Sequence, residues 1–226
     1  MSFLSTTPLS NGVLRREVIA TALKMNALGI NQGKSGNVSA RIDGGFLITP
    51  TGVPYEETKP EQIVAMRMDG EFDGTTLPSS EWRFHRDIYA ARTDVCAIVH
   101  THAAYATTIA CTGEDIPAFH YMIAIAGGRD IRCAPYATFG SQALSDHAVT
   151  ALAGRAACLL AQHGMIAVGA SLSKALALAV EVESLARMYW QVLQIGTPVL
   201  LEDAEMAIVI DKFKTYGQQA LKPPSA

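Results

Sequence analysis

Hydrophobic residues recur every three to four positions in five parts of the chain, a spacing typical of helices. The predicted helices cover residues 13–28, 82–91, 104–110, 172–195 and 202–216. Ser79 or Ser80 is expected to cap the second of them, and Gly196 to end the fourth. The apolar stripe expected along that fourth helix consists of Leu176, Val180, Leu185, Tyr189 and Leu193.

Short apolar segments of strand type stand between these helices. Alternating residues at 38–42 and 46–49 flank Asp43-Gly44-Gly45 and indicate a hairpin. Further strands are predicted at 63–68, 97–100, 158–161 and 165–168. Strands interleaved with helices are typical of the α/β class. We therefore expect one domain over residues 1–226, with a central sheet covered by helices and a short tail from about residue 217.

The composition excludes several classes of protein. Charged residues make up 17% of the chain and hydrophobic residues 49%, against about 25% charged in ordinary soluble domains, which favours an oligomer. A net charge of −3 without a Lys/Arg stripe argues against a nucleic-acid partner. No apolar stretch approaches the roughly 18 residues of a membrane span. The N-terminal residues lack a basic region followed by an apolar core, so no secretory signal is expected.

The cysteines bear on the compartment. Cys96, Cys111, Cys133 and Cys158 are scattered, form no CxxC pair and stand in apolar local sequence. They are expected to be reduced core residues of a cytoplasmic protein.

His100-Thr101-His102 follows an apolar strand and is the strongest chemical signal. Strand side chains alternate with period two, so both imidazoles lie on one face, about 7 Å apart at Cα, and can reach one metal ion. Two ordinary histidines at a strand end explain an isolated pair equally well. His163, between another apolar run and Gly164, is a third candidate. Three imidazoles with an open position are typical of catalytic zinc, but spacing does not decide whether His163 meets the other two.

Glu81 precedes Trp82 at the start of a predicted helix. It is either a solvated glutamate favoured by the helix dipole or a partly desolvated general acid/base.

Small hydrogen-bond donors that could hold a phosphate occur in three groups: Ser35-Gly36-Asn37, Thr49-Pro50-Thr51-Gly52 and Ser79-Ser80. Each group alone is also typical of a turn or a cap.

Several motifs occur in an order that resembles the class II (metal-dependent) aldolase and adducin family. They are Gly-Asn-Val-Ser, Ile-Thr-Pro-Thr-Gly, Leu-Pro-Ser-Ser-Glu-Trp-Arg-Phe-His, Val-His-Thr-His, Ala-Pro-Tyr-Ala-Thr-Phe-Gly and Lys-Phe-Lys-Thr-Tyr-Gly, and they extend over residues 14–217. The resemblance implies a single α/β domain with a mainly antiparallel sheet. It also implies zinc-dependent, reversible cleavage of a ketose 1-phosphate, expected to be L-fuculose 1-phosphate, into dihydroxyacetone phosphate and an aldehyde, L-lactaldehyde.

The resemblance also implies roles for individual residues. His100, His102 and His163 match zinc ligands, and Glu81 matches the acid/base. The positions that match residues around the substrate phosphate are Gly36, Asn37, Thr51, Gly52, Ser79 and Ser80. Tyr121 and Tyr216 match tyrosines at the reacting sugar, and Phe139 matches an aromatic pocket wall. The family further implies a cyclic homotetramer with sites at subunit boundaries and a small sugar phosphate as the partner.

Two positions depart from the family pattern. Lys34 occupies a loop position that is usually uncharged, and Gln162 stands where relatives often carry a second histidine. A 4-epimerase, a dehydratase or decarboxylase, and a non-catalytic adducin-like interaction module remain alternatives. Glu81 favours the aldolase over epimerases, which resemble an aspartate version of this motif. Retention of three histidines and Glu81 favours an enzyme over an interaction module.

Overall fold

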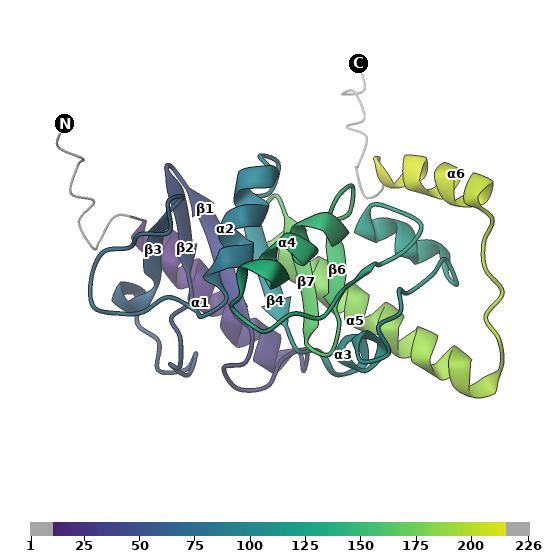
Figure 1. Cartoon of the computed structure of the whole chain (residues 1–226), viewed down its shortest axis with the longest axis horizontal. Helices are drawn as coiled ribbons and strands as arrows, with labels where there is room; N and C mark the ends of the chain where they lie inside the picture. The colour runs from purple at the N-terminus through teal and green to yellow at the C-terminus, as the bar shows by residue number, and fades with distance from the viewer. Residues whose placement is uncertain (1–10, 216–226) are drawn as a thin grey trace, which may run out of the picture.

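The computed structural model describes residues 11–215, and no helix in that range is long and apolar enough to cross a membrane. Within it, seven strands form one sheet in the order β3-β2-β1-β4-β7-β6-β5 (Figure 1). The strands are β1 (Asn37–Ile42), β2 (Gly45–Ile48), β3 (Val64–Arg67), β4 (Ala97–Thr101), β5 (Cys133–Ala134), β6 (Ala157–Leu160) and β7 (Gly164–Gly169). In this described range, all neighbouring strands pair antiparallel except β5 and β6, which confirms the mainly antiparallel α/β sheet.

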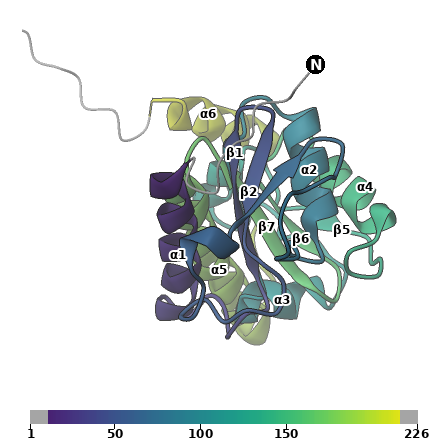
Figure 2. The same cartoon turned by 90° about the vertical axis from the view of Figure 1, so that its left-hand side faces the viewer.

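Helices cover both faces of the sheet. They are α1 (Gly12–Ala27), α2 (Trp82–Ala91), α3 (Ala104–Ala110), α4 (Gln142–Ala151), α5 (Leu172–Ile195) and α6 (Asp203–Phe213), with short 3₁₀ helices η1 (Pro60–Gln62) and η2 (Tyr121–Ala126). Figure 2 shows α1 and α5 on one side of the sheet and α2 and α4 on the other. The fold is therefore a three-layer arrangement with two apolar cores, one on each face of the sheet.

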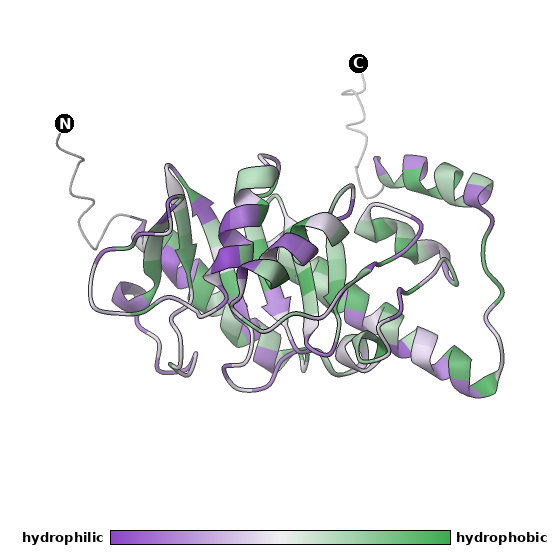
Figure 3. Ribbon diagram, in the orientation of Figure 1, coloured by the Kyte–Doolittle hydropathy of each residue, from purple (hydrophilic) through white to green (hydrophobic). Residues whose placement is uncertain are grey.

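Central strand β4 contributes to both cores because successive side chains of a strand point to opposite faces. Val99 packs in the core beneath α1, α3 and α5, whereas Ile98 packs beneath α2 and α4. Figure 3 shows the strands as mostly apolar and the outer surfaces of α2 and α4 as mostly polar. The hairpin predicted across Asp43-Gly44-Gly45 is confirmed: Gly44 has φ 72°, and a Cβ at Gly45 would lie 2.0 Å from the Met66 carbonyl oxygen.

The predicted helices and strands are present, but the chain between them contains further helices and one further strand. Helix α4, strand β5 and helices η1 and η2 had not been predicted. The start of α4 carries a recognisable signal, because the Ser141 hydroxyl accepts a hydrogen bond from the Leu144 backbone N–H at 3.2 Å. Helix α6 ends at Phe213, and the predicted last residue, Tyr216, lies outside the described residues.

One local prediction about a helix was wrong, and the burial of another helix changes along its length. The residue that precedes α2 is Glu81, and no side chain caps this helix: the Ser79 hydroxyl accepts from the Glu81 backbone N–H at 3.4 Å and from no N–H within the helix. In α5 the predicted stripe is buried at its start, but Leu193 is 45% exposed. The reason is that the last turns of α5 extend beyond the sheet, as Figure 1 shows.

The prediction of four core cysteines was also wrong. Cys158 is buried because it lies in β6 within the sheet, and Cys133 is partly buried in β5. Cys96, just before β4, and Cys111, at the end of α3, are exposed because they stand in connections at the rim of the sheet. All four are free thiols.

Helix α2, which carries residues of the site described below, is held against α4 by the Asp87 carboxylate. Asp87 Oδ2 accepts hydrogen bonds from the Ser145 hydroxyl and the Gln142 side-chain amide, both at 2.6 Å, and Oδ1 accepts from Arg86 Nε at 2.7 Å. Burial by itself raises the pKa of Asp87, but these three donors lower it overall. The ionised carboxylate therefore stabilises the α2–α4 contact.

Asp87→Asn is expected to lower the free energy of unfolding at pH 7 by about 1–2 kcal/mol, since charge-assisted hydrogen bonds to one carboxylate are lost. The folded pKa lies below the unfolded value of about 3.9. The contribution is therefore complete above that value and is lost as pH falls through the folded pKa. Melting temperatures measured from neutral pH to about pH 3 should show the two proteins converging below about pH 4. A difference that persists unchanged at acid pH, or one matched by the exposed hairpin variant Asp43→Asn, would contradict this role.

Candidate active site

Three predicted ligands converge at one end of the central strands of the sheet. Strand β4 runs antiparallel to both β1 and β7, so the end of β4 and the starts of β1 and β7 meet there. His100 is the last residue but one of β4, His102 immediately follows the strand, and His163 immediately precedes β7. The ligand nitrogens of the three histidines all lie within 4.8 Å of one another. His163 therefore meets the other two histidines, which sequence spacing alone did not decide.

A hydrogen bond orients His100, and burial keeps His102 in the form that binds metal. His100 Nδ1 donates to the Met165 carbonyl oxygen at 2.9 Å, which fixes the ring with Nε2 3.2 Å from His102 Nε2. Burial, and then the neighbouring His100 and His163, lower the pKa of His102 to about 4. His102 is therefore neutral at pH 7, as a metal ligand must be.

The carboxylate of Glu81 completes the cluster. Oε2 lies 3.2 Å from His100 Nε2, and Oε1 lies 3.2 Å from His163 Nε2. The side-chain amide of Asn37 donates to Oε2 at 2.9 Å. Burial raises the pKa of Glu81, but the adjacent His100 and His163 imidazoles lower it overall, so the group is ionised. Oε1 is fully buried and accepts no hydrogen bond from any group that the structure describes.

These groups fit a divalent cation. A buried charged oxygen without a hydrogen-bond partner is costly, and Glu81 Oε1 lies 3.2 Å from His163 Nε2, one of the three clustered imidazoles. Imidazole nitrogens with a carboxylate oxygen suit zinc and other first-row divalent ions. The residues that would hold the ion are His100, His102 and His163, with Glu81 beside them.

Two glycines allow the loops to approach these ligands closely. A Cβ at Gly164 would lie 2.6 Å from the Thr101 carbonyl oxygen and 3.0 Å from His102 Cδ2. A Cβ at Gly36 would lie 2.5 Å from the His100 carbonyl oxygen. Any larger residue would therefore push β7 or the loop before β1 away from the metal ligands.

A pocket of about 350 Å³ opens beside the cluster. Its lining residues are Ser35, Ser80, Glu81, His102, Tyr136, Ala137, Phe139, Gln162 and His163. Tyr136 and Phe139 are exposed aromatic residues of the segment between β5 and α4, and Tyr136 had not been singled out from the sequence. Gln162 has φ 52°, a left-handed conformation that is uncommon outside glycine and is often found at functional sites.

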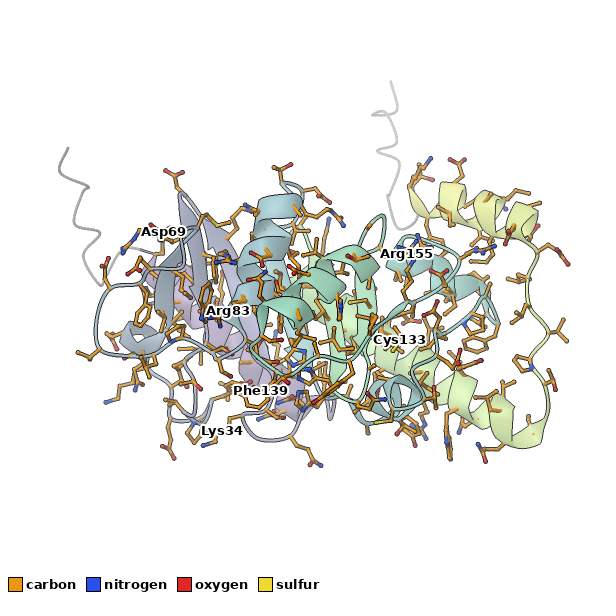
Figure 4. The ribbon with its side chains drawn as sticks, viewed as in Figure 1. Lys34, Asp69, Arg83, Cys133, Phe139 and Arg155 are labelled. Carbon is orange, nitrogen blue, oxygen red and sulfur yellow. The ribbon has the colours of Figure 1, made fainter. Side chains whose placement is uncertain are left out.

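The segment that carries Phe139 is fastened to α2. Arg83 Nη1 donates to the Gly140 carbonyl oxygen at 2.8 Å, and a Cβ at Gly140, where φ is 71°, would lie 2.7 Å from the Ser80 carbonyl oxygen. Figure 4 labels Arg83 on α2 and Phe139 on the segment below it. This attachment positions the aromatic wall of the pocket relative to Glu81 at the start of the same helix.

The three loops proposed to surround a phosphate are hydrogen-bonded to one another. The Ser79 N–H donates to the Thr49 carbonyl oxygen at 3.0 Å, and the Lys34 ammonium donates to the Gly52 carbonyl oxygen at 2.8 Å. Ser80 lines the pocket, whereas Gly36, Thr51, Gly52 and Ser79 are not among its lining residues. The loops are thus gathered beside the pocket, with one cation, Lys34, at their exposed side (Figure 4).

The remaining predicted residues lie elsewhere. The side chain of Asn37 is buried and contacts Glu81 rather than lining the pocket. Tyr121 is 49% exposed at the start of η2 and does not line the pocket either. Tyr216 falls outside the described residues.

Several known proteins are similar to this chain in sequence and in fold. The family model for the class II aldolase and adducin N-terminal domain matches residues 16–190. The chain is 53% identical over 216 residues to 5-methylthioribulose-1-phosphate/5-deoxyribulose-1-phosphate aldolase of Rhodospirillum rubrum, covering 96% of this chain and 98% of that protein. It is 52% identical over 205 residues to L-fuculose phosphate aldolase of Escherichia coli, covering 90% and 95%. A solved structure of L-fuculose 1-phosphate aldolase matches with a TM-score of 0.87 at 40% identity, covering 89% of this chain and 96% of that chain.

The protein therefore belongs to the class II aldolase and adducin family, and within it to the metal-dependent aldolases. The resemblance first indicated by the motifs is confirmed. The non-catalytic adducin-like alternative is set aside, because these similar proteins are named as aldolases and the match covers nearly their whole length.

His163→Ala is expected to weaken binding of a divalent metal, because one of three converging imidazoles is lost. The loss should exceed the roughly 10–100-fold effect of removing a residue that only orients a ligand. Competition with a metallochromic chelator measures the affinity directly. His147→Ala, which removes a histidine of α4 outside the cluster, is the matched control and should bind metal as the unaltered protein does. Equal affinities for the two variants would exclude His163 as a ligand.

Proposed function

We propose that this enzyme catalyses the reversible retro-aldol cleavage of a ketose 1-phosphate, between carbons 3 and 4, into dihydroxyacetone phosphate and an aldehyde. The observation that carries the proposal is the meeting of three histidines and an ionised, buried glutamate beside a pocket of about 350 Å³. The similar aldolases of Rhodospirillum rubrum and Escherichia coli are both named for ketose phosphates, and the first of these names specifies 1-phosphates.

The metal proposed for the cluster is Zn²⁺, with another divalent transition metal as the alternative. When bound, it would supply a Lewis acid that stabilises negative charge developing on the ketone fragment. Neutral His102, and His100 with its Nδ1 committed to the Met165 carbonyl oxygen, present lone pairs for this purpose.

Glu81 is proposed as the group that moves a proton at carbon 3 of the dihydroxyacetone phosphate fragment. Its carboxylate is ionised, buried and adjacent to the proposed metal ligands, which suits a base that acts without competition from water. The proposed phosphate donors are Ser80 and the loops that carry Gly36, Thr51, Gly52 and Ser79. Phe139 would form the wall at the aldehyde end.

Tyr121 and Tyr216 are proposed to exchange the proton at the aldehyde oxygen. Since Tyr121 does not line the pocket of its own chain, this role is proposed for the site of a neighbouring subunit, within a homotetramer whose sites lie at subunit boundaries. The exposed aromatics Tyr121, Tyr136 and Phe139 and the low content of charged residues support such an assembly.

Two kinds of substrate are proposed, a 6-deoxyhexulose phosphate and 5-deoxypentulose phosphates. L-fuculose 1-phosphate would release L-lactaldehyde, whereas 5-deoxyribulose 1-phosphate would release acetaldehyde and its 5-methylthio analogue a methylthio-substituted one. Relatives named for these substrates are 52% and 53% identical to this chain, so identity favours neither. L-fuculose 1-phosphate is proposed first. The 5-deoxypentulose phosphates are the second proposal, and the exposed rings of Tyr136 and Phe139 support it by offering an apolar surface for a deoxygenated end.

The deciding experiment is a cleavage assay with three matched substrates, L-fuculose 1-phosphate, 5-deoxyribulose 1-phosphate and 5-methylthioribulose 1-phosphate, each with and without chelator. Dihydroxyacetone phosphate is measured with a coupled dehydrogenase. We expect kcat/KM to be greatest for L-fuculose 1-phosphate and chelator to abolish cleavage of every substrate, with added Zn²⁺ restoring it. A ribulose 5-phosphate control detects epimerase activity. Failure to cleave any ketose 1-phosphate with Zn²⁺ present would remove the proposed function.

Glu81→Gln is expected to slow hydrogen–deuterium exchange into dihydroxyacetone phosphate in D₂O by about 10²–10⁴-fold, the usual contribution of a general acid or base. The amide has nearly the same shape but cannot accept the proton. Proton NMR of the ketone follows the exchange. Glu71→Gln, an exposed residue after β3, should exchange at the unaltered rate. Rapid exchange in the Glu81 variant would exclude the role of Glu81 as the base.

A further inference from the structure

A row of buried polar side chains runs from Glu81 into the core between the sheet and α2. Asn37 lies next to Glu81, and its side-chain oxygen is 2.5 Å from His85 Nε2. His85 Nδ1 is 2.7 Å from the Ser39 hydroxyl, which is in turn 2.8 Å from the Tyr89 hydroxyl. None of the five residues is more than 5% exposed. They form a continuous hydrogen-bonded chain, defined here as the buried relay.

Local geometry explains why these residues meet. Asn37 and Ser39 are two apart on β1, so they point to the same face of the sheet. Glu81, His85 and Tyr89 are spaced four apart at the start of α2 and along it, so they lie on one side of the helix. The signal was present in the sequence as this spacing, but His85 could also have been an ordinary core histidine.

The surroundings of the buried relay are apolar. Phe46, Phe84 and Ile88 belong to the same core, and the ring of Phe84 stacks on that of His85 at 4.6 Å between centroids. An unpaired polar group at such a place costs about 1–3 kcal/mol. Packing alone would be satisfied by apolar residues here, so the paired polar groups call for another explanation.

The donor and acceptor roles along the buried relay have only one consistent direction. The Asn37 side-chain N–H₂ group donates to Glu81 Oε2, so the Asn37 carbonyl oxygen faces His85. His85 must then carry its proton on Nε2, and its Nδ1 accepts from the Ser39 hydroxyl. The Ser39 oxygen is left to accept from Tyr89. Burial lowers the pKa of His85 to about 3, so the ring is neutral and holds a single proton at pH 7.

We infer that His85 is a positioning residue for the proposed base. Through its Nε2–H it holds the Asn37 amide with the N–H₂ group toward Glu81, and thereby holds the Glu81 carboxylate beside the histidine cluster. If Asn37 turned over, its carbonyl oxygen would face the carboxylate, and like partial charges would drive Glu81 from its place. Asn37 then acts on Glu81, which its buried side chain contacts directly.

This inference rests on the proposed function, and a matched pair of variants tests it. His85→Gln places an amide near the position of Nε2 and can still donate to Asn37. His85→Asn places its amide near the position of Nδ1 and leaves Asn37 without that donor. Both remove the ring and keep a buried amide, so they share any purely structural cost.

We expect His85→Asn to slow proton exchange into dihydroxyacetone phosphate and kcat by roughly 10–100-fold, the range found when an orienting partner is removed. KM for the ketose 1-phosphate should stay nearly unchanged, because the residues proposed to bind the phosphate are untouched. His85→Gln should recover most of the loss. Metal content and melting temperature, measured for both, separate positioning from damage to the fold. Equal activities of the two variants would overturn the inference.

A second measurement does not depend on activity. Nitrogen-15 NMR of labelled histidines in the unaltered protein should show His85 protonated on Nε2 and not on Nδ1. The opposite tautomer would overturn the inference even if His85→Asn fails to fold. Unaltered protein that neither exchanges protons nor cleaves ketose phosphates overturns the proposed function instead. Normal exchange in both the unaltered protein and His85→Asn overturns the role of His85 alone.

Discussion

The structure depends on keeping one ionised carboxylate buried against three imidazoles. Moving Glu81 out of water carries a large desolvation cost, and the Asn37 amide with the His100 and His163 imidazoles offsets part of it. These partners come from β1, the end of β4 and the turn before β7. Small shifts of any of these elements would leave the charge without compensation, so the central antiparallel strands and α2 must keep fixed relative positions.

The rest of the fold maintains those positions. The Asp87 carboxylate ties α2 to α4, and Arg83 ties α2 to the segment that carries Phe139. Gly36 and Gly164 let loops approach β4 where a Cβ would collide with its backbone. The two sides of the site therefore come from different parts of the fold. The ends of the central strands carry the histidines, and an exposed segment between β5 and α4 carries the aromatic wall.

This division has a consequence for specificity within the aldolase family. In the proposed reaction, the histidine cluster and the proposed phosphate loops would face the part of the substrate that every ketose 1-phosphate shares. Tyr136 and Phe139 stand on an exposed segment that can change without disturbing β4 or β7. Similar aldolases named for different ketose phosphates are compatible with that arrangement, because only the aldehyde end of the substrate differs among them.

Sequence alone determined what depends on neighbours along the chain. Helical and strand periodicity predicted most elements, and period two placed His100 and His102 on one face of a strand. The motif order indicated the family. Contacts between distant segments were decided only by the tertiary structure: the meeting of His163 with β4, the pairing of Asn37 with Glu81, the buried place of His85 and the exposure of Cys96 and Leu193. The physical reason is that a residue type and its spacing restrict local backbone geometry, whereas the partner and burial of a side chain depend on which other segments pack against it.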